Sequence, residues 1–138
     1  MVVRNFFIIT LLVAISLASG ACHSANVAVL GEESVLKIGD CICVEGEELQ
    51  IKFLEVTGDS RCPKGVTCIW AGEVSCTVEI EYRESINRLT LTEPGLTDWP
   101  PERSFREYRL VYHVEPYPVA GVEIAEDDYR LHLTVAKR

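Results

Sequence analysis

Long apolar runs and basic residues are both scarce in this chain of 138 residues. The longest apolar run, Phe6–Ala18, has thirteen residues, whereas a helix that spans a bilayer needs about 20. Lys and Arg number 13 against 21 Asp and Glu, and the formal net charge is −8. Because phosphate binding requires a basic surface, nucleic acid is not an expected partner. There is no internal repeat and no low-complexity tract, so we expect one globular domain.

Signatures of catalysis and of common cofactor sites are absent as well. The chain lacks the G-x-S-x-G of many hydrolases and the C-x-x-C of thiol redox proteins. Its carboxylates do not show the spacing of a calcium-binding loop, and a solvated acidic face explains them. No cofactor is therefore expected, and a non-enzymatic role is the leading hypothesis.

The first twenty-one residues have the pattern of a secretory signal peptide. Met1–Arg4 carries one positive charge, the apolar run follows, and Ser19–Ala21 are small residues suited to cleavage. The segment would be a hydrophobic helix if it were retained. Two processing routes are open: cleavage immediately after these residues, or attachment of a lipid to Cys22. Residues 17–22 resemble a lipobox, with a serine where leucine is usual. Either route predicts an extracytoplasmic protein, secreted or anchored at the cell envelope, that touches a membrane only through the signal segment or the lipid.

Alternation of apolar and polar residues dominates the remainder of the chain. The clearest run, Glu73–Tyr82, is apolar at every second position, whereas a helix would need spacings of three and four. Residues 22–34 are mostly small and polar and predict a tether, in which Val27–Leu30 would add an edge strand. Residues 35–138 predict a single all-β domain. We expect an antiparallel β-sandwich or small barrel of about six to seven strands.

Two interruptions of this pattern bear on the fold. Gly39 and Asp40 break the run Val35–Val44, which is expected as one interrupted strand. Glu93–Ser104 holds three prolines and one glycine and predicts a long surface connection. Long connections in compact domains are often functional, so Trp99 within it is a candidate binding residue, although an ordinary connection also explains the stretch.

The most distinctive segment is Asp59–Val74, DSRCPKGVTCIWAGEV. It places two cysteines, a proline, two glycines and a tryptophan between two alternating runs, which predicts a loop that joins two strands. Its DSRCP…CIWAG pattern resembles a motif of small exported proteins and lipoproteins of bacteria and archaea. The resemblance begins near Leu49, covers the motif, and continues weakly at Pro116–Pro118 and Asp128–Leu131.

This resemblance implies an exported all-β domain in which Cys62 and Cys68 form a disulfide, and it brings no established activity. The other cysteines are not part of the motif. Cys76 lies on the inward face of its expected strand, and we expect it to bridge to Cys41 or Cys43 between sheets. A soft metal such as Cu(I), bound by these three residues, is the alternative.

The motif also supplies candidate binding residues. A staple that fixes the strand connection is the simplest role for the loop, and a rigid recognition tip is the functional alternative, since preorganised loops lose less entropy on binding. Asp59 would accept backbone N–H groups, and Arg61 would bind a carboxylate or carbonyl oxygens of the loop. Trp70 would either pack over the disulfide or the sandwich end, or stand exposed for a partner.

Two histidines, His113 and His132, fall at outward positions of expected strands. Neighbouring histidines can bind a transition metal, but solvated side chains are the simpler expectation, so they are weak metal candidates and no metal is predicted. The sequence therefore favours an exported, non-enzymatic β-domain with a binding or structural role at the cell envelope. Its partner would be a protein or another envelope component. A small extracytoplasmic metal-binding protein or hydrolase is the alternative.

Overall fold

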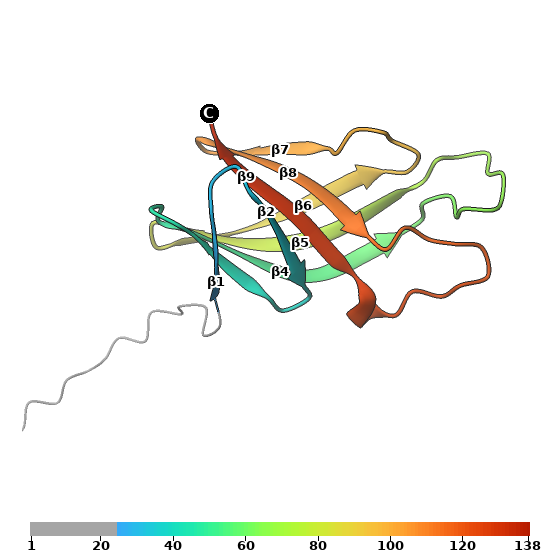
Figure 1. The fold of residues 1–138 in the computed structure, drawn as a ribbon, viewed down its shortest axis with the longest axis horizontal. Coiled ribbons are helices and arrows are strands. Elements are labelled where there is room, and N and C mark those ends of the chain that lie inside the picture. The colour runs from blue at the N-terminus through green and yellow to red at the C-terminus, as the bar shows by residue number, and fades with distance from the viewer. Residues whose placement is uncertain (1–24) are drawn as a thin grey trace, which may run out of the picture.

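The computed structural model describes residues 25–138, which form nine β-strands in two stacked sheets (Figure 1). The expected signal peptide and the expected lipid site at Cys22 lie outside the described residues. One sheet has the strand order β1-β3-β4-β5-β6 and the other has β2-β9-β8-β7. The strands are β1 (Ala25–Ala28), β2 (Glu33–Lys37), β3 (Cys41–Val44), β4 (Leu49–Asp59), β5 (Glu73–Tyr82), β6 (Ser85–Pro94), β7 (Glu102–Phe105), β8 (Tyr108–Glu115) and β9 (Arg130–Lys137).

Helical structure in residues 25–138 consists of one short 3-10 turn, η1 (Glu126–Asp128). The described part of the chain therefore contains no helix long and apolar enough to cross a membrane.

The hydrophobic core lies between the two sheets and follows the alternation of the sequence. In β5, the side chains at positions 74, 76, 78 and 80 are fully buried, and those between them are not. The strands β4, β8 and β9 alternate in the same way. Two sheets that face each other cover all of these apolar faces at once. The all-β prediction is confirmed. Of the two architectures, the sandwich is present, because the sheets keep separate edge strands and do not close into a barrel.

The expected strand Val35–Val44 is in fact two strands that lie in different sheets. Gly39, at φ 91°, lets the chain turn between β2 and β3, since a positive φ is accessible to glycine without a steric penalty. Because β2 crosses to the opposite sheet, β1 and β3 enter their own sheet in the same direction and pair in parallel. The sandwich is therefore not wholly antiparallel.

Two further segments contribute strands that the sequence pattern did not predict in full. Residues 25–34, expected as a tether with a loosely paired edge, supply β1 and the start of β2, and Ala28 is part of the core. The connection Glu93–Ser104 contains most of β7, which pairs with the first half of β8. These short strands bring the total in the described residues to nine, above the expected six to seven.

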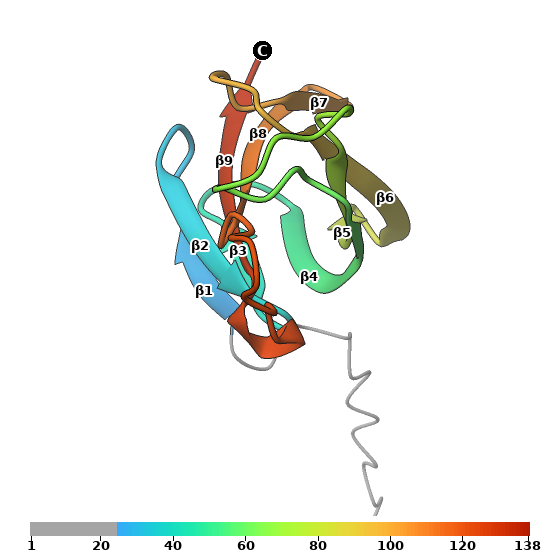
Figure 2. The same ribbon diagram turned by 90° about the vertical axis from the view of Figure 1, so that its right-hand side faces the viewer.

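Three connections gather at one end of the sandwich, on the right in Figure 1 and toward the viewer in Figure 2. They are residues 60–72, 95–101 and 116–129. Two bulges in β4, after Phe53 and Val56, increase its twist and bend it, and Figure 2 shows the strand strongly curved as it approaches this end. The connections touch each other: Lys64 forms a β-bridge with Val119, and the amide of Gly95 donates to a carbonyl oxygen in the first connection.

The described core predicts that truncating a buried side chain lowers the free energy of unfolding much more than truncating an exposed one. We expect Phe53→Ala to lower the free energy of unfolding by about 3–5 kcal/mol, because the ring is fully buried and its removal leaves a cavity. Ile86, which is largely exposed on β6, is the matched control, and Ile86→Ala should change stability by less than about 0.5 kcal/mol. Urea denaturation followed by far-UV circular dichroism measures both. Similar losses for the two variants would contradict the described core.

Candidate functional site

The most distinctive loop of the sequence is covalently closed. Cys62 and Cys68 form a disulfide with their Cα atoms 5.8 Å apart, which confirms the expected pairing. Cys62 is buried, whereas the chain from Lys64 to Trp70 is exposed. The disulfide therefore joins the buried start of the loop around Cys62, which we call the foot, to the solvent-facing part of the loop.

A buried guanidinium anchors this foot. The side chain of Arg61 is fully buried and forms an ion pair with Asp59, with Nη2 2.6 Å from Oδ2 and Nε 2.9 Å from Oδ1. Nη1 donates to the carbonyl oxygen of Val114 at 2.7 Å, and Nη2 donates to that of Pro116 at 2.9 Å. Arg61 thus joins the end of β4 to the end of β8 across the two sheets. The expected carboxylate and carbonyl partners are both present, but the carbonyls belong to β8 and the segment after it, outside the loop.

Two tyrosines complete the anchor. The ring of Tyr117 lies under the guanidinium of Arg61, with the centroid 4.9 Å from Cζ, and its hydroxyl donates to the carbonyl oxygen of Cys62 at 3.0 Å. The hydroxyl of Tyr129 donates to Oδ2 of Asp59 at 3.2 Å. Burial, and then the negative charge of Asp59, raises the pKa of Tyr129 above its ordinary value. That tyrosine therefore stays a neutral hydrogen-bond donor at physiological pH.

Close backbone packing fixes the other side of the loop. A Cβ atom on Gly72 would lie 1.8 Å from the carbonyl oxygen of Ser60, and one on Gly95 would lie 2.1 Å from that of Ala71. Only glycine fits at these two positions. Gly95 also donates its amide to the carbonyl oxygen of Gly72 at 2.8 Å. The connection after β6 is therefore held directly against the disulfide loop.

Large apolar side chains project from these two connections into solvent. Ile69 is 93% exposed, Trp70 80% and Trp99 81%, and they are accompanied by Leu96 and Val66. We call these five residues the tip. Trp70 is therefore exposed rather than packed over the disulfide or the sandwich end. Large apolar side chains that remain exposed on fixed loops commonly mark an interaction surface.

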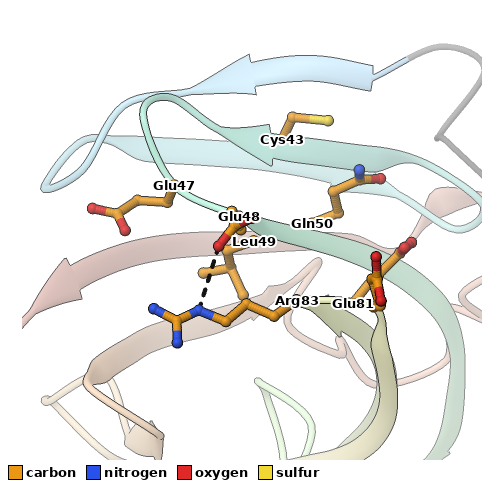
Figure 3. Close-up of a pocket in the computed structure, with 8 residues that line it drawn as sticks. Cys43, Glu47, Glu48, Leu49, Gln50, Glu81 and Arg83 are labelled. Atoms are coloured by element: carbon orange, nitrogen blue, oxygen red, sulfur yellow. Dashed lines mark ion pairs between the residues drawn. The ribbon is translucent and has the colours of Figure 1, made fainter.

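The structure also contains two shallow hollows, one at each end of the first sheet. The first lies at the foot of the loop, between the end of β4 and the start of β5, and is lined by Asp59, Ser60 and Glu73 among others. Figure 3 shows the second, where Cys43, Gln50 and Glu81 line an open surface crossed by the ion pair between Arg83 and Glu48. Neither hollow contains a histidine, so neither offers the histidine base that commonly activates a nucleophile.

The other cysteines correct the expected pairing. Cys43 and Cys76 are free thiols, so the predicted bridge from Cys76 is wrong. Cys76 points into the core from β5, Cys43 lies on β3, and β4 runs between those strands. Cys41 is itself disulfide-bonded, and the three residues therefore do not form the Cu(I) site that was the alternative. Burial, assisted by the charge of Glu93, raises the pKa of Cys76 to about 12.

His113 and His132 are direct neighbours across β8 and β9. Each has a carboxylate on Nδ1: Glu93 for His113 at 2.6 Å, and Glu33 for His132 at 3.0 Å. Sequence reasoning did not single out Glu93, which lies in β6 of the opposite sheet and is buried. Its carboxylate reaches β8 because β7 pairs with β8 only as far as Val111. Beyond that point, the backbone amide of Val114 donates a hydrogen bond to Oε2 of Glu93.

Comparison with known proteins adds no assignment to these features. The chain matches no family model, no curated protein and no solved structure.

The contacts of Arg61 predict that removing its side chain strongly lowers the free energy of unfolding. We expect Arg61→Ala to lower the free energy of unfolding by about 3–5 kcal/mol, because Asp59 would be left buried without its partner. Arg83 is the matched control, since its pair with Glu48 lies in solvent, and Arg83→Ala should cost about 0–1 kcal/mol. Both are measured by urea denaturation. A loss below about 1 kcal/mol for the Arg61 variant would show that this residue does not anchor the loop.

The two free thiols are expected to differ in reactivity. Cys43 is partly exposed and should be alkylated by iodoacetamide in the folded, unreduced protein. Cys76 should stay unmodified until the protein is unfolded, because its thiol is buried and its raised pKa leaves almost no reactive thiolate. Peptide mapping by mass spectrometry distinguishes the sites. Alkylation of Cys62 or Cys68 without a reductant would contradict the disulfide.

Proposed function

We propose that this chain is an exported, non-enzymatic β-domain that binds a protein or another envelope component through the tip. One observation carries the proposal. Trp70 and Ile69 stand in solvent on a loop that a disulfide, a buried ion pair and close glycine packing all hold in place. Several large apolar side chains exposed together on neighbouring, fixed connections are a common sign of an interaction surface.

The physical advantage of such a tip is its preorganisation. A flexible loop loses conformational entropy when it is ordered on binding, and a loop that is already ordered does not. Tryptophan is also the residue type that most often contributes large binding energies at protein interfaces. The anchor thus performs two tasks: it closes one end of the sandwich, and it fixes the buried start of the loop that carries Trp70.

Export is the second part of the proposal. It is supported by the signal-peptide pattern of the first twenty-one residues and by the disulfides, because disulfides persist in oxidising compartments and are rare in the cytosol. The resemblance of the DSRCP…CIWAG motif to small exported proteins and lipoproteins supports the same location. A partner at the cell envelope is the natural consequence of that location.

The proposal predicts that the tip determines partner recovery. Proteins cross-linked to the intact protein in an envelope extract of its source cell should be strongly reduced when Trp70→Ala is used as bait. Truncation of a central tryptophan commonly costs about 2 kcal/mol or more in binding, which is about a thirtyfold loss of affinity. Quantitative mass spectrometry of the recovered proteins measures the change.

The matched control is Ile86→Ala. Ile86 is also a largely exposed apolar residue, but it lies next to the turn between β5 and β6, at the opposite end of β6 from the tip. Recovery with this variant should equal that of the unchanged protein. Equal recovery with Trp70→Ala as well would sink the role proposed for the tip, provided that circular dichroism shows both variants folded.

A further inference from the structure

An unbroken series of side-chain contacts runs across the outer face of the second sheet. Glu33 of β2 contacts Nδ1 of His132, and Glu93 contacts Nδ1 of His113. Glu115 lies between the two rings: its Oε2 is 3.4 Å from Nε2 of His132 and its Oε1 is 3.6 Å from Nε2 of His113. Three carboxylates thus alternate with two imidazoles, and the ring centroids are 6.1 Å apart.

The contacts on Nδ1 determine which nitrogen carries a proton. An ionised carboxylate can only accept a hydrogen bond, so Nδ1 of each histidine must be the donor to Glu93 or Glu33. In a neutral imidazole the other nitrogen, Nε2, then has a lone pair and no proton. Both lone pairs face the oxygens of Glu115, which are also electron-rich. While the rings are neutral, this arrangement of acceptors is unfavourable, and a cation bound between them would relieve it.

The spacing also suits a metal ion better than a proton. A hydrogen bond between nitrogen and oxygen has a heavy-atom distance of about 2.7–3.2 Å, and the gaps to Glu115 are longer, at 3.4 and 3.6 Å. Two ligand atoms that each lie about 2.0–2.1 Å from a tetrahedral ion are about 3.3–3.4 Å apart. The gaps between each Nε2 and Glu115 are close to that ligand spacing.

We propose that His113, His132 and Glu115 bind a divalent transition-metal ion of the zinc class on this face. Imidazole ligands favour zinc, copper and nickel over calcium and magnesium. Two histidines with one glutamate form a known zinc-ligand set that leaves a position open for water. Glu93 and Glu33 would hold the two rings through Nδ1. A carboxylate that accepts a hydrogen bond from the second ring nitrogen is a usual outer partner of a metal-bound histidine.

Binding requires a small closure. Among residues 25–138, no three His, Cys, Asp or Glu side chains are already gathered as a metal centre. Glu115 can make this adjustment, because its side chain is 54% exposed, while Glu93 and Glu33 hold the two rings. The backbones of Glu115 and the two histidines are fixed by the pairing of β8 with β9, so the closure needs only side-chain rotations.

Zinc titration of the tag-free protein, followed by calorimetry, tests the proposal. We expect saturable binding of one ion, no binding of Ca²⁺, and weakening as the pH falls, because an imidazole must lose its proton to bind metal. His113→Ala, His132→Ala and Glu115→Gln should each weaken binding by at least tenfold. Glu33→Gln should weaken it by about 10–100-fold, the usual effect of losing an outer partner.

The chain offers controls for other metal ligands. His23→Ala and Cys43→Ser should leave zinc binding unchanged, and NMR should show zinc-dependent shifts of Nε2 in His113 and His132 but not in His23. Absence of saturable binding, or binding that survives loss of either His113 or His132, would overturn the site. So would an unchanged affinity of Glu115→Gln. Tip variants share no residue with this site, so its failure and that of the proposed function are separate results.

Discussion

The buried ion pair between Arg61 and Asp59 is the constraint on which the functional end of this molecule depends. A charged guanidinium with no exposed surface is costly unless its nitrogens are hydrogen-bonded, and here a carboxylate and two backbone carbonyls accept hydrogen bonds from all three nitrogens. Those carbonyls belong to the end of β8 and to the segment beyond it. The same side chain therefore connects the end of the second sheet to the start of the disulfide loop.

The disulfide acts on a different part of the same loop. Arg61 fixes the foot by contacts made only in the folded state, whereas the bond between Cys62 and Cys68 limits the freedom of the seven-residue ring in any state. Together they explain how a long exposed segment can present Trp70 without collapsing onto the sandwich. In the described residues, every buried side-chain nitrogen and oxygen has a hydrogen-bond partner, which is consistent with a well-determined end.

Local pattern was enough to predict the class of fold and the longest strands. Glu73–Tyr82 was predicted with its correct bounds, since alternation of apolar residues directly reflects burial of one face. The partners of Arg61 could not be predicted, because Val114 and Pro116 lie more than fifty residues away and offer only backbone oxygens. The role of Glu93 could not be predicted from the sequence either, because its contact with His113 depends on β7 being short. The exposure of Trp70 was left open because tryptophan is common both in cores and at interfaces.

Native-state hydrogen exchange tests the central claim, that the loop is held in one conformation, most directly. The amide of Cys62 donates to the carbonyl oxygen of Ala71 within the loop, and the amides of Lys64 and Gly95 donate to backbone carbonyls of neighbouring connections. All three should therefore exchange slowly, at rates that approach those of β5. Amides at the exposed tip, such as that of Ile69, should exchange rapidly. Rapid exchange at Cys62 and Lys64 would contradict the account, because it would mean that the foot of the loop opens independently of the sandwich.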